Sequence, residues 1–323
     1  MDQVKNAKLK LITAMFIFGT IGLCVRNIPL PSSVIAMTRG IIGVIFLLGV
    51  IRFKKERLSL GSIRKNLFWL ALSGAVLGFN WIALFEAYRY TSVAVGTLCN
   101  YMAPILVILA SPIVLKEKLT ARKLLCVLVA LFGMVGISGV LQTGIPASGE
   151  LKGILLGLAS AVMYAGIVLL NKQIRGISAY DKTIVQLGAS ALVLLPYNLA
   201  TVPLGSLSLD LAGAATLLLV GVLHTGFTYY LYFGSLEHIS GQTVAIISYI
   251  DPVVAVLASV LILREPMLLT EGVGALLILG AALASELSPA EKRSESSNVS
   301  YDGDSSSTDL GKRPVSGLPA PGP

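Results

Sequence analysis

Long apolar runs with few charged residues recur along most of this chain, and they constrain its fold more than any other feature. A helix rises about 1.5 Å per residue, so roughly 20 residues span the apolar core of a bilayer. Ten stretches of about that length are present: 8–27, 32–52, 67–88, 92–114, 121–140, 151–172, 182–203, 210–233, 240–263 and 269–287. None alternates with the period of two that a membrane barrel requires. Because backbone groups in lipid need internal partners, the sequence predicts an all-α membrane protein with ten transmembrane helices.

The composition excludes a water-soluble globule. Only 13% of the residues are charged and 55% are hydrophobic, whereas soluble domains carry about 25% charged residues. From residue 288 onwards Ser, Pro, Gly and mixed charges dominate, so we expect a disordered cytoplasmic tail over 288–323. The two histidines and three cysteines have no metal-ligand spacing, so we expect neither a metal site nor a cofactor.

The basic residues indicate an orientation. They concentrate before the first stretch and in the loops after stretches two, four and six, whereas the alternate loops hold only Arg26, Arg89, Lys152 and Arg264. Lys and Arg concentrate on the cytoplasmic side, so an even number of crossings places both termini in the cytoplasm. We therefore expect a multi-pass protein of the plasma or inner membrane, and we attribute the net charge of +8 to topology rather than to nucleic-acid binding.

The second half of the chain repeats the first at a shift of about 148 residues. The matches are Gly78-Phe79 with Gly226-Phe227, Phe85 with Phe233, Ser92 with Ser240, Tyr101-x-x-Pro104 with Tyr249-x-x-Pro252, Leu109-Ala110-Ser111 with Leu257-Ala258-Ser259, and Leu115-Lys116-Glu117 with Leu263-Arg264-Glu265. We expect two five-helix repeats, 8–140 and 150–287. Since five is odd, the second repeat must enter the membrane from the opposite face. Such inverted repeats are typical of secondary transporters, which hold substrate near the midplane.

Several motifs resemble the EamA repeats of the drug/metabolite transporter superfamily. The segments Phe85–Ser92, Tyr101–Pro104 and Leu115–Thr120 are similar to the first EamA repeat, and Asp251-Pro252 with Arg264-Glu265-Pro266 is similar to the second. The resemblance covers about residues 8–287. It implies a central cavity lined mainly by helices 1, 3, 4, 6, 8 and 9, and export or exchange of amino acids or other small metabolites. In one departure, Phe18-Gly19 and Met163-Tyr164 stand where many relatives have Trp.

Polar residues inside the predicted helices are candidate binding groups, because burying them in lipid is costly. Asp251 lies about halfway along helix nine, directly before Pro252, which frees a backbone carbonyl. Ser248 and Tyr249 lie within one turn of it. Transporters place binding groups at such broken helices. The alternative is a carboxylate that only shapes the kink.

The first repeat contributes a matching set. Asn100 and Tyr101 precede Pro104 on helix four, where Asn100 could instead bond between helices. Asn80 and Trp81 on helix three align with Thr228 and Tyr229 on helix eight, as cavity walls or as packing. With Tyr164 on helix six, the predicted substrate-binding residues are Asp251, Ser248, Tyr249, Asn100, Tyr101, Trp81, Asn80, Tyr229 and Tyr164.

Other residues receive structural or proton-coupling roles. Pro104 and Pro252 are expected to be structural. Arg39 lies on helix two, which is not expected to face the cavity, so we expect a structural ion pair with Glu86 or snorkelling, with substrate contact as the alternative. Asp251, His224 and Glu86 are the candidates for proton coupling, although a single membrane histidine such as His224 is more often a hydrogen-bonded packing residue.

Small-residue spacings permit close helix contacts, either within one bundle or between two copies in a homodimer. They are Gly74/Gly78, Gly153/Gly157 and Gly133/Gly136/Gly139.

The sequence has no phosphate-binding loop, zinc motif or nucleophile elbow. It therefore predicts no enzyme, but a secondary transporter not driven by ATP. Its partners would be a small neutral or zwitterionic metabolite, with amino acids as a fitting class, and protons. The alternatives are a membrane-embedded enzyme acting on a lipid or isoprenoid with His224, Asp251 and Glu86 as catalytic groups, and a scaffold or sensor without flux.

Overall fold

The computed structural model describes residues 2–114, 120–138, 141, 148–203, 205, 207–236, 238–239 and 241–286. Within these residues the secondary structure is helical and includes no strand. The helices are α1 (Asp2–Gly19), α2 (Ile21–Val25), α3 (Ser32–Phe53), α4 (Leu60–Tyr90), α5 (Val93–Asn100), α6 (Ala103–Val114), α7 (Ala121–Ile137), α9 (Ser148–Asn171), α10 (Ala179–Thr201), α11 (Leu211–Leu219), η2 (Val220–Phe227, a π-helix), α12 (Thr228–Leu236), α13 (Gly241–Ser248), α14 (Ile250–Leu261) and α15 (Leu269–Glu286). The predicted tail 288–323, Gly139 and the motif residues 115–119 lie outside the described residues.

Each of the ten predicted stretches coincides with a helix or with consecutive helices. Seven helical segments of the described chain are long and apolar enough to cross a membrane: Gln3–Val25, Ser32–Phe53, Leu60–Tyr90, Val93–Val114, Ser148–Asn171, Ala179–Thr201 and Leu211–Leu236. Stretches five, nine and ten coincide with the shorter helices α7, α13–α14 and α15. The predicted all-α membrane fold is confirmed.

One predicted boundary is wrong. The apolar pattern places the start of the third stretch near residue 67, but α4 begins at Leu60, so Arg64 and Lys65 lie in a helix rather than in a loop. Asn66 holds this extension in place, because its Nδ2 donates to the carbonyl oxygens of Ser62 and Arg175, each at 2.9 Å.

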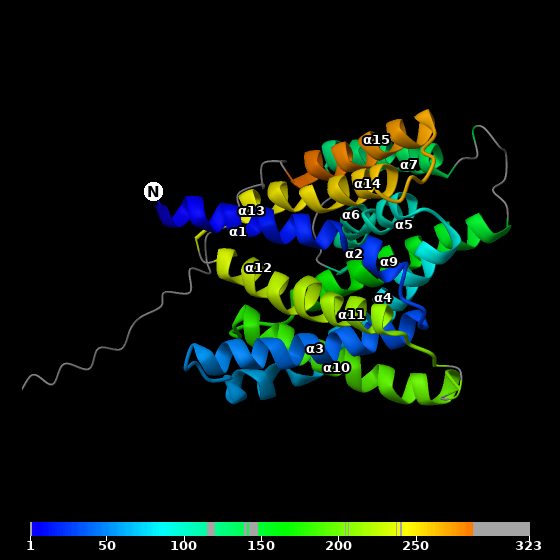
Figure 1. Cartoon of the computed structure of the whole chain (residues 1–323). Helices are drawn as coiled ribbons and strands as arrows, with labels where there is room; N and C mark the ends of the chain where they lie inside the picture. Colours follow the sequence, from blue (N-terminus) through cyan, green and yellow to red (C-terminus); the bar gives the residue numbers. More distant parts are fainter. Residues whose placement is uncertain are drawn as a thin grey trace, which may run out of the picture. The chain divides into compact units, whose positions relative to one another are not determined.

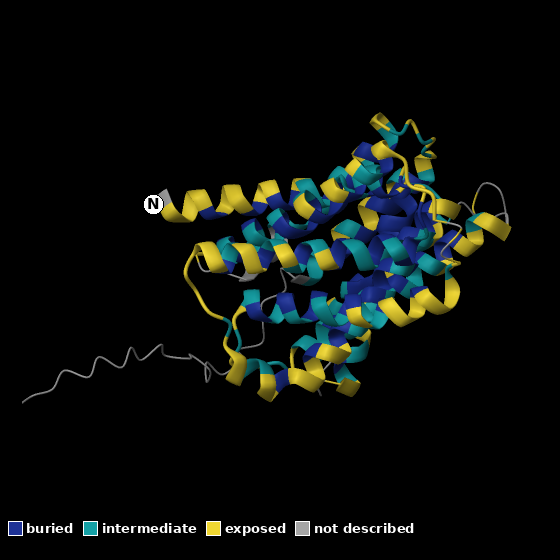
Figure 2. Ribbon diagram, turned by 60° about the horizontal axis from the view of Figure 1, so that its bottom comes forward, coloured by how far each residue is buried: buried dark blue, intermediate teal, exposed yellow. Residues whose placement is uncertain are grey.

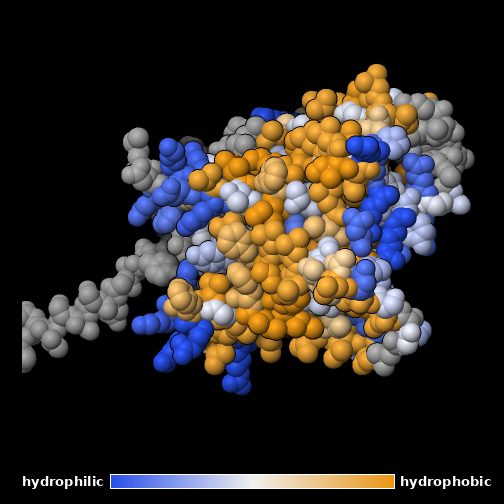
Figure 3. Space-filling model, in the orientation of Figure 1, coloured by the Kyte–Doolittle hydropathy of each residue, from blue (hydrophilic) through white to orange (hydrophobic). Residues whose placement is uncertain are grey.

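Apolar side chains cover the outside of the bundle between its two ends. Large apolar residues such as Ile45, Phe132 and Leu192 are exposed, and Figure 3 shows an orange band of them with hydrophilic residues at both ends. Buried residues instead face the interior between the helices (Figure 2). This distribution suits a bundle whose sides contact lipid tails and whose ends contact water.

The helix contacts between the two halves include equivalent pairs, which the 148-residue shift relates. α4 packs on α9, and their counterparts α12 and α1 also pack together; α6 packs on α9 as α14 packs on α1. α7 and α15, which correspond to each other, form a pair of their own. In Figure 1 the first half begins at the end marked N, whereas α9 begins at the opposite end. A two-fold axis between inverted repeats produces this pattern.

The described glycines of the predicted small-residue spacings lie inside this bundle. A Cβ added at Gly74 would lie 2.5 Å from the carbonyl oxygen of Gln186, and one at Gly133 would lie 2.7 Å from that of Gly274. These glycines therefore bring α4 against α10 and α7 against α15. The homodimer stays a prediction.

Candidate functional site

A cavity of about 420 Å³ lies between the two halves. Its wall is formed by α1–α2, α3, α4, α5–α6, α9, α12 and α13–α14. It includes all nine predicted substrate-binding residues: Asn80, Trp81, Asn100, Tyr101, Tyr164, Tyr229, Ser248, Tyr249 and Asp251. The structure thus brings them together around one space, and their role in binding stays a prediction.

Helices four and nine are interrupted at equivalent tyrosines on the cavity wall. The break between α5 and α6 contains Tyr101, with φ and ψ of −72° and 1°, and the break between α13 and α14 contains Tyr249, with −72° and −8°. Pro104 and Pro252 lie in the first turn of the following half-helix, where a missing N–H costs little. The breaks therefore precede the two prolines and lie 148 residues apart.

A hydrogen bond between Tyr101 and Asp251 links the two repeats at these breaks. The Tyr101 hydroxyl donates to Asp251 Oδ2 at 2.7 Å. α1 passes directly beside the second break, because a Cβ at Gly19 would lie 2.5 Å from the Asp251 carbonyl oxygen. Ser248 points its hydroxyl back into its own helix, donating to the Val244 carbonyl oxygen at 2.8 Å.

A second polar chain joins α4, α9 and α5 on the wall. Asn80 Nδ2 donates to the carbonyl oxygen and the Oγ of Ser160, both at 2.8 Å, and Ser160 Oγ donates to Asn100 Oδ1 at 2.7 Å. Both amides are thus held between helices while they also line the cavity. Sequence reasoning missed Ser160, although a serine midway along helix six was a readable signal.

Aromatic rings form much of the remaining wall. Tyr229 stacks on Phe233 with ring centroids 5.6 Å apart, and Phe18 meets Tyr229 edge-on at 5.4 Å. Phe18 therefore supplies an aromatic ring to the cavity wall. Sequence reasoning also missed Tyr88, whose hydroxyl lies 3.1 Å from that of Thr97. Both residues line the cavity.

Arg39 corrects two expectations. Helix two does face the cavity, because Arg39 on α3 lines it. The guanidinium also makes no ion pair with Glu86: its Nε donates to Thr225 Oγ1 at 3.1 Å, and its Cζ lies 4.0 Å from the centroid of the Trp81 ring. The π-helix η2 presents Thr225 to α3, which the sequence pattern did not indicate.

Glu86 and His224 lie off the cavity wall. Glu86 Oε2 accepts a hydrogen bond from Ser32 Oγ at 2.7 Å and lies 3.7 Å from Arg89 Nε. His224 is buried in η2, and its Nε2 lies 3.1 Å from Thr20 Oγ1 at the junction of α1 and α2. Of the three proton-coupling candidates, only Asp251 borders the cavity.

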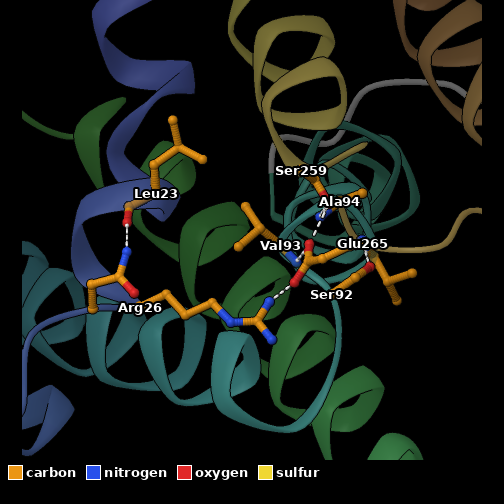
Figure 4. Close-up of polar contacts among 9 residues, drawn as sticks. Leu23, Arg26, Ser92, Val93, Ala94, Ser259 and Glu265 are labelled. Atoms are coloured by element: carbon orange, nitrogen blue, oxygen red, sulfur yellow. Dashed lines mark hydrogen bonds and ion pairs between the residues drawn. The ribbon is translucent and has the colours of Figure 1, made fainter. Parts of the chain in front are cut away.

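One end of the bundle carries a polar cluster between the repeats, shown in Figure 4. Arg26, after α2, pairs with Glu265, which follows α14. Glu265 Oε2 accepts from the backbone N–H of Val93 at 3.0 Å and from Ser259 Oγ, so it caps the start of α5. We call Arg26, Val93, Ser259 and Glu265 the end cluster.

The two ends of the cavity differ in packing. α5 packs against α14 beside the end cluster. The pair that the 148-residue shift makes equivalent, α13 and α6, has no comparable contact within the described residues. The end cluster lies at the α5–α14 end, and the two repeats deviate from exact symmetry in this contact.

In the part of the chain that the structure describes, no three His, Cys, Asp or Glu residues gather as they would around a metal ion. The cavity wall consists of aromatic, aliphatic, amide and hydroxyl groups, with Arg39 as its basic and Asp251 as its acidic side chain. Such a wall is suited to binding an organic solute.

The model of the EamA-like transporter family matches residues 6–139 and 151–285. The chain belongs to the EamA-like transporter family. The relatives of this EamA-like protein include the uncharacterized transporter YxxF of Bacillus subtilis, which is 30% identical over 262 residues covering 79% of this chain and 81% of the relative. An uncharacterized transporter of Archaeoglobus fulgidus is 26% identical over 87% of this chain and 96% of its own length.

Protein PecM of Dickeya dadantii is 28% identical over 62% of this EamA-like chain and 66% of its own. A solved crystal structure has a TM-score of 0.61 and 19% identity, and the match covers 86% of this chain and 96% of the other. At that identity the likeness shows the fold alone. The family and the relatives together make this chain a membrane transporter of the drug/metabolite type.

Proposed function

We propose that this EamA-like protein is a secondary transporter that exports or exchanges a small organic metabolite by alternating access. The observation that carries the proposal is the cavity of about 420 Å³ between inverted repeats, with one guanidinium and one carboxylate in an otherwise uncharged wall. Opposite charges in one enclosed space favour a zwitterion, and an amino acid is the simplest metabolite of that kind. Its place would be the plasma membrane, with both termini in the cytoplasm.

The different packing at the two ends of the cavity supports alternating access. If the halves exchange conformations, the α5–α14 contact opens as the equivalent α6–α13 contact forms. The transported metabolite then meets the same midplane groups from either side. The rival hypothesis of a membrane-embedded enzyme has His224, Asp251 and Glu86 as its candidate catalytic groups. These residues lie in three separate environments, which favours transport over catalysis.

Exchange in proteoliposomes tests the proposal. Purified protein would be reconstituted into vesicles loaded with one unlabelled L-amino acid at a time, and uptake of the same radiolabelled compound would be measured. We expect uptake above that of protein-free vesicles for at least one compound, without ATP. Chemical conversion of the compound without net movement would contradict the proposal, as would absence of exchange across a panel of amino acids and other small metabolites.

We assign proton coupling to Asp251, since it borders the cavity and joins both repeats. Asp251→Asn cannot release a proton, so the pH dependence of exchange should flatten in this variant. His224→Gln, off the wall, should keep the wild-type profile. A pH profile unchanged in Asp251→Asn would exclude Asp251 from this role.

A further inference from the structure

Arg39 is held rigidly at one edge of the cavity. Its side chain is 3% exposed, and its Nε–H is bonded to Thr225 Oγ1 at 3.1 Å. The Thr225 hydroxyl proton is itself donated to the Val220 carbonyl oxygen at 3.0 Å, five residues earlier in the π-helix. The hydroxyl therefore acts as an acceptor toward Arg39 and fixes the Nε edge of the guanidinium.

The flat face of the guanidinium is also occupied. Its Cζ lies 4.0 Å from the Trp81 ring centroid and 5.4 Å from that of Phe85. This cation–π contact orients the plane of the group. With one face on an aromatic ring and the Nε edge bonded, the Nη edge is left to make hydrogen bonds elsewhere.

No carboxylate of the described residues lies within ion-pair distance of Arg39. The ion pairs recorded there are Arg26–Glu265, Lys54–Glu56 and Arg89–Glu86. Neither Nη atom has a hydrogen-bond acceptor among the described residues. Both atoms keep some accessible surface, and because Arg39 lines the cavity, we take that surface to face the cavity. A largely buried charge without a counterion is unfavourable.

The geometry points to Arg39 as the group that binds a carboxylate of the transported metabolite. A guanidinium can bind a carboxylate by donating two parallel N–H···O hydrogen bonds, here from its two Nη atoms. Asp251, on the same wall, would take the positive group of a zwitterion, and the rings around Trp81 and Tyr229 would contact its organic body. This inference rests on the proposed function and adds a specificity-determining residue to it.

Fluorescence of Trp81 tests the binding step on the purified full-length protein. The chain has two tryptophans, so Trp69→Phe leaves Trp81, in contact with the guanidinium, as the sole reporter. The probes are benzoate and benzamide, which match in size and differ in charge. We expect a saturable change in emission with benzoate that benzamide reproduces only at much higher concentration. Equal responses to both, or no response to benzoate, would overturn the inference.

Variants separate recognition from folding. Arg39→Gln in the Trp69→Phe background should weaken benzoate binding about tenfold or more, because it removes charge-assisted hydrogen bonds. Arg39→Lys keeps the charge but not the fork, so it should bind with intermediate affinity. Thr225→Val leaves the guanidinium intact and frees its Nε, so it should weaken benzoate binding severalfold while benzamide binding does not change.

Arg89→Gln is the matched control, since it removes the same charge from the end of α4 and away from the cavity wall. It should leave benzoate affinity unchanged, and a decrease as large as that of Arg39→Gln would contradict a specific site. The melting temperature without probe identifies variants that fail to fold; if Arg39→Gln is among them, the benzoate affinity of Thr225→Val decides the test. If benzoate binds through Arg39 but vesicles show no exchange, the proposed function fails while the carboxylate site stands.

Discussion

At the scale of single residues, the bond between Tyr101 and Asp251 has the clearest consequence. It joins the two helix breaks, and therefore the two repeats, within the cavity. The Tyr101 hydroxyl is a donor, so it compensates a carboxylate that is removed from water. The two side chains should act as one unit.

A double-mutant cycle tests this unity. Tyr101→Phe removes only the hydroxyl and should lower the exchange rate about tenfold, the effect of a lost hydrogen bond to a charged group. Asp251→Ala, which removes the acceptor, should lower it at least as much, but the double variant should be no slower than Asp251→Ala alone, since the shared hydrogen bond is already lost. Exchange rates of the four proteins in identical vesicles provide the measurement. Independent, multiplicative losses would show that the bond is not functional.

Arg39 shows what the sequence could not predict at this scale. Helix α3 is apolar on nearly all sides, so no polar stripe indicates which side faces the cavity. Glu86 was the nearest acidic residue by expected depth, but Ser32 and Arg89 occupy it. Arg39 instead donates a hydrogen bond to Thr225, which a π-helix positions. A π-helix adds one residue to a helical turn, and this insertion cannot be recognised in the spacing of apolar residues. The nine predicted wall residues were accessible to sequence reasoning because each is polar or aromatic in an apolar helix.

At the scale of helices, the end cluster ties α2, α5 and the segment after α14 together. Glu265 caps the start of α5 from the opposite repeat, so opening this end must break its bonds. We predict that Glu265→Gln weakens the ion pair and shifts the population toward a cavity open at the α5–α14 end.

Cysteine labelling measures that shift. Leu84→Cys, on the cavity wall, would be introduced into a cysteine-free protein, and its reaction with a membrane-impermeant thiol reagent applied at the α5–α14 side would be timed. Glu265→Gln and Arg26→Gln should each accelerate labelling severalfold. Arg264→Gln, next to the cluster in sequence, is the control and should not. Unchanged labelling in both test variants would mean that the cluster stabilises the fold without controlling access.

The sequence predicted the helices better than their interruptions. Ten apolar stretches emerge because bilayer thickness sets a minimum length for each crossing. Pro252 correctly indicated a disturbance in helix nine, but the break lies at Tyr249, since proline fits the first turn of the next half-helix. The early start of α4 was missed because Asn66 and Arg175 are 109 residues apart in the chain, and their contact cannot be read from local composition.

At the scale of the whole bundle, the described chain begins and ends at the same end: α1 starts and α15 finishes on the side marked N in Figure 1. An even number of membrane crossings places the start and the end of a chain on the same side. Together with the distribution of basic residues, it predicts that both termini face the cytoplasm.

Site-specific labelling in intact cells tests this topology. A cysteine replacing Lys5 in a cysteine-free protein and an epitope tag added after Pro323 should both stay inaccessible to impermeant probes until the cells are opened. Gly149→Cys, exposed at the start of α9, should react from outside and serves as the opposite-side control. Accessibility of Lys5→Cys and the tag from different sides would refute the even count.

We infer that the helix breaks at Tyr101 and Tyr249, which are equivalent in the two repeats, act as hinges. Only the half-helices next to the cavity would then rotate during transport. The flanking helices α3 and α10, packed on each other, need not tilt. The surrounding bilayer would then deform little during each transport cycle, and the transport rate should depend only weakly on bilayer thickness.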